Sequence, residues 1–203
     1  MAVAFCSLPG KAELVTIKIE AVVDDIQDPD NYLNGLVNVG DLITGTYTYD
    51  TDTPDSNPSS NVGRYEHFAP PCGFSLNVGG LSFATDPANT YFVMRILDNY
   101  LDDDFYWLTS YNNSPLSNGT SVNNIDWMLG DPSETAISTI ELPRTAPVLG
   151  DWEVTFLNIG GGPGGREGFV FLSHVTFAAD IPEPTTLLLL GLGGVIFVRR
   201  TKK

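Results

Sequence analysis

The chain has little of what metal centres and nucleophilic enzymes are built from. Its 203 residues include two cysteines, Cys6 and Cys72, and two histidines, His67 and His174. Neither cysteine belongs to a Cys-x-x-Cys pair or a His-rich cluster, which argues against a zinc site. The Gly-x-Ser-x-Gly pattern of one large hydrolase class is absent, and a triad would need a histidine beside a Ser or Cys. The composition therefore gives no support to zinc or triad chemistry.

Basic residues are scarce and scattered. Residues 1–180 hold six of the ten Lys and Arg residues and 24 of the 25 Asp and Glu residues, a net charge of −18. A body this acidic repels phosphate backbones, and no stripe of cations is present that would follow one. We therefore expect no nucleic-acid partner. The remaining residues reverse the sign, with four basic residues against one acidic residue.

Helical periodicity is also missing, apart from a weak one-turn candidate near Asn31–Val37. Short runs rich in Val, Ile, Thr, Tyr and Phe instead alternate apolar with polar residues between Gly, Pro, Asn and Asp, which is typical of strands joined by turns. The clearest runs are Leu14–Val23, Leu42–Tyr49, Phe74–Phe83, Tyr91–Leu97, Phe105–Tyr111, Trp152–Ile159 and Gly168–Ala178. The Gly79-Gly80 pair predicts a tight hairpin.

The length suits one core with appendages. We predict a mainly β fold, an antiparallel β-sandwich of jelly-roll type, for an ectodomain over residues 13–180. Residues 1–12 and 181–203 are assigned to separate segments at the two ends of the chain.

The C-terminal segment has three different pieces in a fixed order. The pieces are Pro182-Glu183-Pro184, an uncharged apolar run over residues 185–198, and the basic residues Arg199, Arg200, Lys202 and Lys203. The prolines favour an extended spacer. As a helix the 14-residue run spans about 21 Å, against ~30 Å for a bilayer core, and the cations after it suit the cytoplasmic side. We predict a single short transmembrane helix.

Together, the Pro-Glu-Pro tripeptide, the Leu- and Gly-rich run and the terminal Arg-Arg cluster resemble the PEP-CTERM sorting signal of Gram-negative bacteria. The resemblance covers residues 181–203. It implies processing near the tripeptide by an exosortase, an integral-membrane, transpeptidase-like enzyme. It also implies export, with a transient stay in the inner membrane before the cell surface or extracellular matrix. A non-catalytic surface or matrix protein is the function expected.

The N-terminus departs from that pattern, because it lacks the basic region and the full apolar stretch of a secretory signal. Residues 1–8 are apolar and small, and Gly10 and Ala12 suit the −3 and −1 positions of a cut before Glu13. We interpret residues 1–12 as the remnant of a signal peptide; the alternative is an ordinary first strand. Cleavage there would remove Cys6 and leave Cys72 without an intrachain partner.

One loop has the composition of a calcium site. Its candidate ligands are Asp50, Asp52, Asp55 and Asn57, which directly follow a predicted strand. Alternating Asp and Asn oxygens can surround a hard cation, although the glycine and glutamate of an EF-hand loop are missing. A solvated Asp-rich turn is the alternative. Two further acidic groups, residues 24–30 and 98–104, are interpreted as exposed turns, and no other cofactor is expected.

Aromatic residues in loop-rich stretches are the last candidates: Tyr106, Trp107, Tyr111 and Trp127. With Asn and Asp nearby they would suit stacking on an extracellular polysaccharide, although tryptophans are commonly core residues. The alternative functions are therefore a carbohydrate- or calcium-binding lectin-like module and, less strongly, a glycoside hydrolase with paired carboxylates. The candidate carboxylates are Glu66, Glu141, Glu153 and Glu167.

Overall fold

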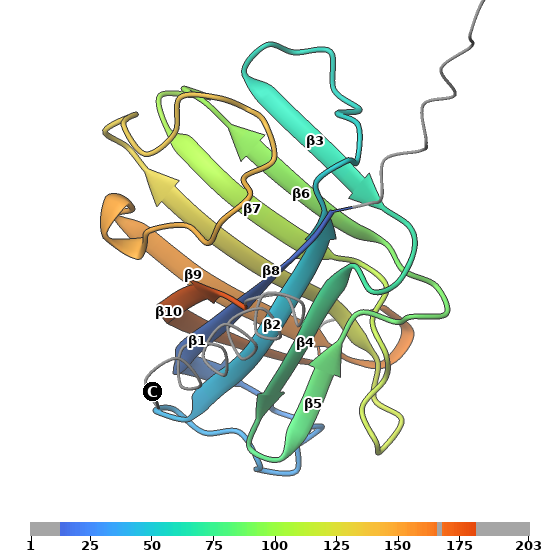
Figure 1. Ribbon diagram of the computed structural model, residues 1–203. Coiled ribbons are helices and arrows are strands. Elements are labelled where there is room, and N and C mark those ends of the chain that lie inside the picture. The colour runs from blue at the N-terminus through green and yellow to red at the C-terminus, as the bar shows by residue number, and fades with distance from the viewer. Residues whose placement is uncertain (1–12, 166–167, 182–203) are drawn as a thin grey trace, which may run out of the picture.

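A computed structural model describes residues 13–165 and 168–181, and within them ten strands form one continuous antiparallel sheet (Figure 1). The strands are β1 (Leu14–Gln27), β2 (Leu42–Asp50), β3 (Val62–His67), β4 (Gly73–Val78), β5 (Leu81–Ala84), β6 (Phe92–Leu97), β7 (Asp104–Ser110), β8 (Val122–Asp131), β9 (Val154–Gly161) and β10 (Phe169–Asp180). Two 3₁₀ turns, η1 (Leu149–Asp151) and η2 (Pro163–Gly165), lie in the connections. The order across the sheet is β3-β6-β7-β8-β9-β10-β1-β2-β4-β5.

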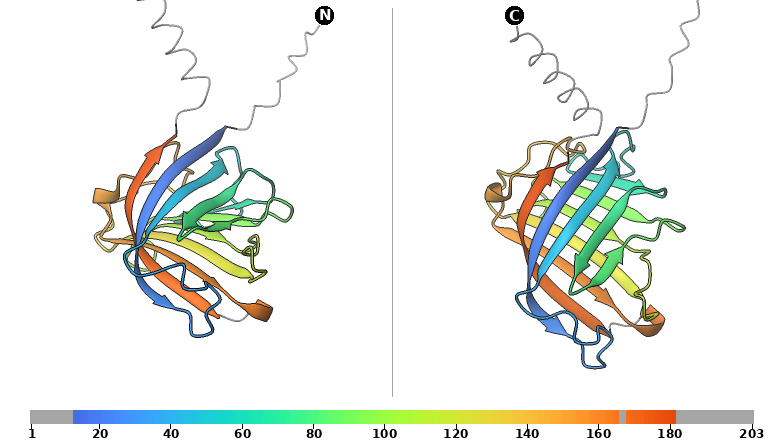
Figure 2. Two further views of the ribbon diagram at one scale, coloured as in Figure 1. Left: turned by 90° about the horizontal axis from the view of Figure 1, so that it is seen from below. Right: turned by 60° about the horizontal axis from the view of Figure 1, so that its bottom comes forward.

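The mainly β, antiparallel prediction is confirmed, but the described strands do not divide into the two sheets of a sandwich. The single sheet curls, so that strands distant in its order face each other (Figure 2). The hydroxyls of Tyr47 on β2 and Tyr106 on β7 lie 3.0 Å apart, and the rings of Phe83 on β5 and Phe171 on β10 lie 5.4 Å apart. The core is therefore the concave face of one sheet.

Alternation along the strands decides which side chains reach this core. On β1 the buried residues are Ile17, Ile19, Ala21 and Val23. Large aromatic rings fill the centre, where the Tyr47 and Trp127 rings are 4.8 Å apart. Burial raises the pKa of the Tyr47 and Tyr106 hydroxyls well above the ordinary tyrosine range, which keeps both neutral donors and acceptors.

Two strands, β3 and β8, were not predicted from the sequence. β3 directs Gly63, Tyr65 and His67 into the core, so only one large apolar residue marks its buried face. β8 contains an irregularity of register between Val122 and Asn124, which shifts the phase of its alternation. The one-turn helix near residues 31–37 was wrong, because Asn31 (φ 58°) and Asn34 (φ 53°) take left-handed conformations that end a helix.

The predicted hairpin is confirmed at Gly79-Gly80. Val78 and Leu81 pair across it, and both glycines have positive φ, 58° and 81°. This is the conformation of a type I′ turn. A side chain on Gly79 would overlap the Leu36 carbonyl oxygen, whereas Gly80 faces open space.

The long β8–β9 connection, residues 132–153, is held over one end of the core by buried acceptors. Asp131 accepts hydrogen bonds from the Ser133 hydroxyl and from the Ser133, Thr135 and Ala136 amides. Asp104, in an acidic group expected to be an exposed turn, is instead fully buried. It accepts the Ile137 amide at 3.0 Å.

Two core tyrosines also form hydrogen bonds with the β8–β9 connection, from the side of the core. The Tyr49 hydroxyl donates to the Pro143 carbonyl at 2.8 Å, and the Tyr65 hydroxyl donates to the Ile140 carbonyl at 2.7 Å. Between the connection and the sheet lies a mostly apolar cavity of about 330 Å³, whose walls include Tyr106 and Trp152.

The described residues contain no helix with the length and apolarity needed to cross a membrane. The helix predicted over residues 185–198 lies outside them.

The two hairpin glycines provide a matched stability test. We expect Gly80→Ala to cost only the left-handed strain of about 1–2 kcal/mol. Gly79→Ala should lose about 1–3 kcal/mol more, because the new methyl displaces the Leu36 backbone. Urea unfolding of both variants measures the difference, and equal midpoints would contradict this account of the turn.

The Asp131 carboxylate makes the stability of the domain depend on pH in the acidic range. The hydroxyl of Ser133, followed by the amides of Thr135 and Ser133, holds the pKa of this carboxyl well below its usual range. Its stabilisation is therefore complete above the unfolded pKa of about 3.9 and is lost as the pH falls toward the folded value. Asp131→Asn should be less stable at neutral pH and lose less on acidification. Asp102→Asn, in an exposed turn, is the control in urea titrations at each pH.

Candidate functional site

The junction with the predicted sorting segment is fixed by hydrogen bonds on the domain side. Asp180 ends β10 and pairs with Ile17 on β1, and the Ile181 amide donates to the Thr16 carbonyl at 2.9 Å. The Asp180 carboxylate also accepts the Ala146 amide from the β8–β9 connection at 2.8 Å. The backbone is thus paired up to the residue immediately before Pro182.

The start of β1 lies at the same place. Glu13 forms an ion pair with Arg144 in the β8–β9 connection. Antiparallel pairing of β1 with β10 brings both ends of the described domain to one side (Figure 2).

Several predicted residues lie outside the described part of the chain. They are residues 1–12, Glu167, the tripeptide Pro182-Glu183-Pro184, the apolar run 185–198, and the basic residues Arg199, Arg200, Lys202 and Lys203. The predictions made for them remain predictions.

The oxygens of the predicted calcium loop mostly bind the loop's own backbone. Asp50 accepts the Asp52 amide at 3.0 Å, and Asp55 accepts the Asn57 and Arg64 amides at 2.8 and 2.9 Å. Asn57 accepts the Ser59 amide at 2.9 Å. These contacts describe an Asx-rich turn. Among the described residues no group of three or more His, Cys, Asp or Glu side chains could hold a metal ion. The calcium prediction therefore gains no geometric support.

The four aromatic candidates separate into two pairs by the face they occupy. Tyr106 and Trp127 are core residues, with 2% and 0% of their surface exposed. Trp107 and Tyr111 lie on the opposite, outer face, where Tyr111 is 41% exposed. Only this second pair can meet a ligand from solvent.

Tyr111 belongs to a row of rings that the sequence did not reveal. We call Phe68, Tyr91 and Tyr111 the outer aromatic row. The Phe68 and Tyr91 rings are 5.4 Å apart and nearly parallel, and the Tyr91 and Tyr111 rings are 5.1 Å apart. Phe68 is 68% exposed. The row crosses from the end of β3 to the segments flanking β6 and β7, so three loop ends build it jointly.

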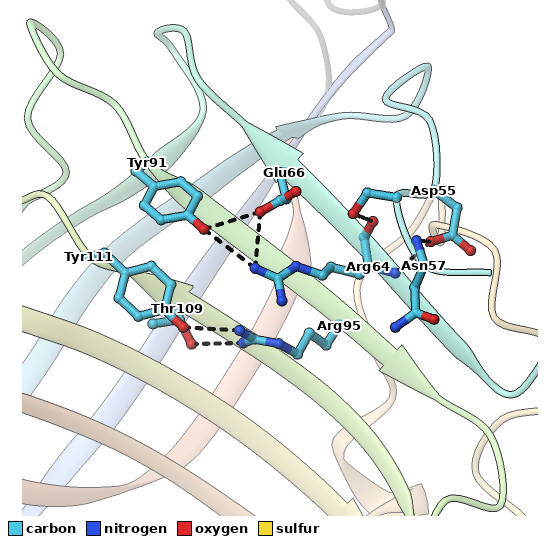
Figure 3. Close-up of polar contacts among 9 residues, drawn as sticks. Asp55, Asn57, Arg64, Glu66, Tyr91, Arg95, Thr109 and Tyr111 are labelled. Atoms are coloured by element: carbon cyan, nitrogen blue, oxygen red, sulfur yellow. Dashed lines mark hydrogen bonds and ion pairs between the residues drawn. The ribbon is translucent and has the colours of Figure 1, made fainter. Parts of the chain in front are cut away.

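Two arginines lie beside this row (Figure 3). Arg64 forms an ion pair with Glu66 at 3.0 Å, and the Tyr91 hydroxyl donates to the same carboxylate at 3.1 Å. Although partial burial raises the pKa of Glu66, these hydrogen bonds outweigh it and the pKa is lowered. Glu66 is therefore an ionised partner of Arg64.

Arg95 is held differently. Its guanidinium lies over the Trp107 ring, 5.0 Å from the centroid. It donates to the Tyr111 hydroxyl at 2.9 Å and more weakly to Thr109 at 3.4 Å (Figure 3). A ring and two hydroxyls orient this cation without neutralising it.

Tyr111 also forms a wall of an open polar hollow of about 360 Å³. The other polar side chains around it are Asp86, Asn89, Asn112, Asn113 and Asn123. The Asn113 side-chain oxygen is buried without a hydrogen-bond partner among the described residues. The hollow therefore presents amide groups next to the exposed ring of Tyr111.

The two histidines and the described thiol lie apart from this surface. His67 is buried, which lowers its pKa, and its Nε2 lies 3.3 Å from the Asp50 amide. Burial raises the pKa of the Cys72 thiol to about 11. His174 is exposed on β10 and contacts Asp24 at 2.7 Å.

Comparison with known protein families identifies a PEP-CTERM protein-sorting motif at residues 180–203. The chain thus carries the sorting signal that the sequence resembles, and this motif implies an exported protein sorted by an exosortase. No curated protein and no solved structure matches the chain.

The pairing at the junction predicts a local effect of Asp180. Asp180→Ala removes the acceptor of the Ala146 amide, a bond worth about 1 kcal/mol. Hydrogen exchange of peptides spanning residues 142–149 should become about fivefold faster. Asp151→Ala, in the same connection, is the control, and unchanged exchange in Asp180→Ala would show that the contact does not hold the junction.

Proposed function

We propose that this protein is a non-catalytic component of the cell surface or extracellular matrix, delivered there by its C-terminal sorting segment. The observation that carries the proposal is the PEP-CTERM motif at residues 180–203, directly continuous with a compact domain whose backbone is paired to Ile181. The motif makes the chain a substrate of an exosortase, and the folded domain is the part that reaches the cell surface or matrix.

The proposed route assigns a task to each terminal piece. Residues 1–12 act in export. Residues 185–198 insert in the inner membrane, and the four terminal cations keep that end on the cytoplasmic side. Pro182-Glu183-Pro184 is where the exosortase acts. The paired junction supports this order, because it leaves the domain folded on one side of the tripeptide.

The surroundings of two candidate catalytic groups, Glu66 and Cys72, support a non-catalytic role. Glu66 is engaged by Arg64 and Tyr91, so it is not poised as a proton donor. Cys72 is buried with a raised pKa, which opposes formation of a reactive thiolate. A domain that needs only to fold and remain soluble fits these contacts.

Carbohydrate binding is a second candidate function for the domain once it is at the cell surface or in the matrix. The observation that favours it is the outer aromatic row, which leaves Phe68 and Tyr111 exposed beside an amide-lined hollow.

The sorting proposal is tested by the mature C-terminus. Intact-mass measurement on protein from the native host should show loss of the residues after the Pro-Glu-Pro tripeptide. Replacing residues 182–184 with three alanines should leave the full-length mass in the membrane fraction. Pro54→Ala, which changes a proline in an exposed loop, should be processed normally. Full-length protein in the cytoplasm of the unaltered strain would refute the proposal.

A further inference from the structure

We propose that the outer aromatic row, Arg95 and the adjoining amide-lined hollow form one binding site for an acidic polysaccharide. Sugar rings stack on the exposed aromatic side chains, and a carboxylate of the polymer pairs with Arg95. The location of this binding outside the cell rests on the proposed function, whereas the site itself rests on the contacts that follow.

The first observation is an uncompensated cation. Residues 13–165 and 168–181 contain four Lys and Arg residues, of which three form ion pairs with carboxylates. Arg95 is the exception among them, although 25 Asp and Glu residues give the chain a net charge of −15. Its orientation is nevertheless fixed by Trp107 and Tyr111. A guanidinium has five N–H donors, so those that Arg95 does not use remain for a planar anion such as a carboxylate.

The second observation is the row of rings beside that cation. Phe68, with 68% of its surface exposed, and Tyr111, with 41%, extend the apolar area on both sides of Tyr91. Aromatic faces next to hydrogen-bonding groups suit sugar rings, whose C–H faces are apolar and whose edges carry hydroxyls. Because Tyr111 bonds directly to Arg95, a sugar on this ring would place its carboxylate near the guanidinium.

The third observation is the hollow on the other side of Tyr111. Asparagine amides both donate and accept hydrogen bonds, as sugar hydroxyls do. Asn89, which lines the hollow, is exposed, so its amide can meet a ligand from solvent. The row and the hollow share Tyr111, so the surface continues beyond one sugar and suits a polymer.

An acidic peptide could also pair with Arg95, but it explains the surface less completely. A carboxylate-rich peptide has no use for a row of aromatic faces, and its carboxylates would meet Asp86 in the hollow. A polysaccharide with charged sugars at intervals can place a carboxylate on Arg95 and hydroxyls against the asparagines. The net charge of −15 opposes any polyanion at long range, but salt screens this repulsion beyond about 10 Å at 0.1 M.

The test is a binding titration with the full-length protein purified in detergent. The probes are polygalacturonate, neutral dextran and poly-glutamate, at moderate salt. We expect binding to polygalacturonate and at least tenfold weaker binding to the other two polymers. Arg95→Gln and Phe68→Ala should each weaken polygalacturonate binding about tenfold or more, because they remove the charge-assisted bonds and the exposed ring separately.

Lys18→Gln is the matched control. It removes one positive charge on β1, distant from the site in the order of the sheet, and should bind like the unaltered chain. Thermal unfolding checks that each variant is folded. If Arg95→Gln does not fold, Phe68→Ala still tests the proposal, because it alters an exposed side chain.

Absence of polygalacturonate binding, or binding that survives both substitutions, would overturn the proposal. Equal binding of dextran would refute the role of Arg95, and equal binding of poly-glutamate would indicate an acidic protein partner instead. The titration is independent of sorting. A chain that is sorted but does not bind would therefore fail this inference alone, and a chain that binds but keeps its tail would fail only the proposed function.

Discussion

A single sheet has no second layer to cover its apolar face, so this domain depends on the curl that folds the sheet onto itself. The contact between the Tyr47 and Tyr106 hydroxyls joins strands far apart in the sheet order. Large rings such as Trp127, which is fully buried at this centre, fill the space between the facing strands of the curled sheet. The β8–β9 connection then closes one end, and it can do so because buried carboxylates and tyrosine hydroxyls satisfy its backbone.

Sequence reasoning found the elements whose alternation is uninterrupted and missed those where it is broken. β1 and β2 were evident because each has alternate apolar residues in one phase, from Ile17 to Val23 on β1 and at Ile43, Tyr47 and Tyr49 on β2. β3 places Gly63 and His67 on its buried face, and β8 changes phase near Val122, so neither shows a clean pattern. Periodicity also says which side of a strand is buried, but not which distant strand it meets. The expected sandwich and the observed curled sheet have the same strand pattern.

The candidate sites also differ in how far the sequence alone could predict them. The sorting signal is a linear string of residue types, and it was recognisable without a fold. The outer surface is assembled from separate segments, and only the structure joins Phe68, Tyr91 and Tyr111. Part of it was nevertheless accessible, since alternation within β7 places Trp107 opposite the buried Tyr106. Arg64 pairs with Glu66 two residues along the same strand, whereas the contact of Arg95 with Tyr111 joins two separate segments.

The place of β10 within the sheet also has a mechanical meaning. This strand leads into the sorting segment and pairs with β1 over residues 170–180 and with β9 over residues 169–173. Tension applied through a membrane-held tail would act along β10 and load the long ladder with β1 in shear, many bonds at once, before it reached the shorter ladder with β9. An edge strand such as β5 has one ladder, and it would peel away bond by bond. The chain therefore leaves the domain through a strand suited to withstand pulling on the residues that follow it.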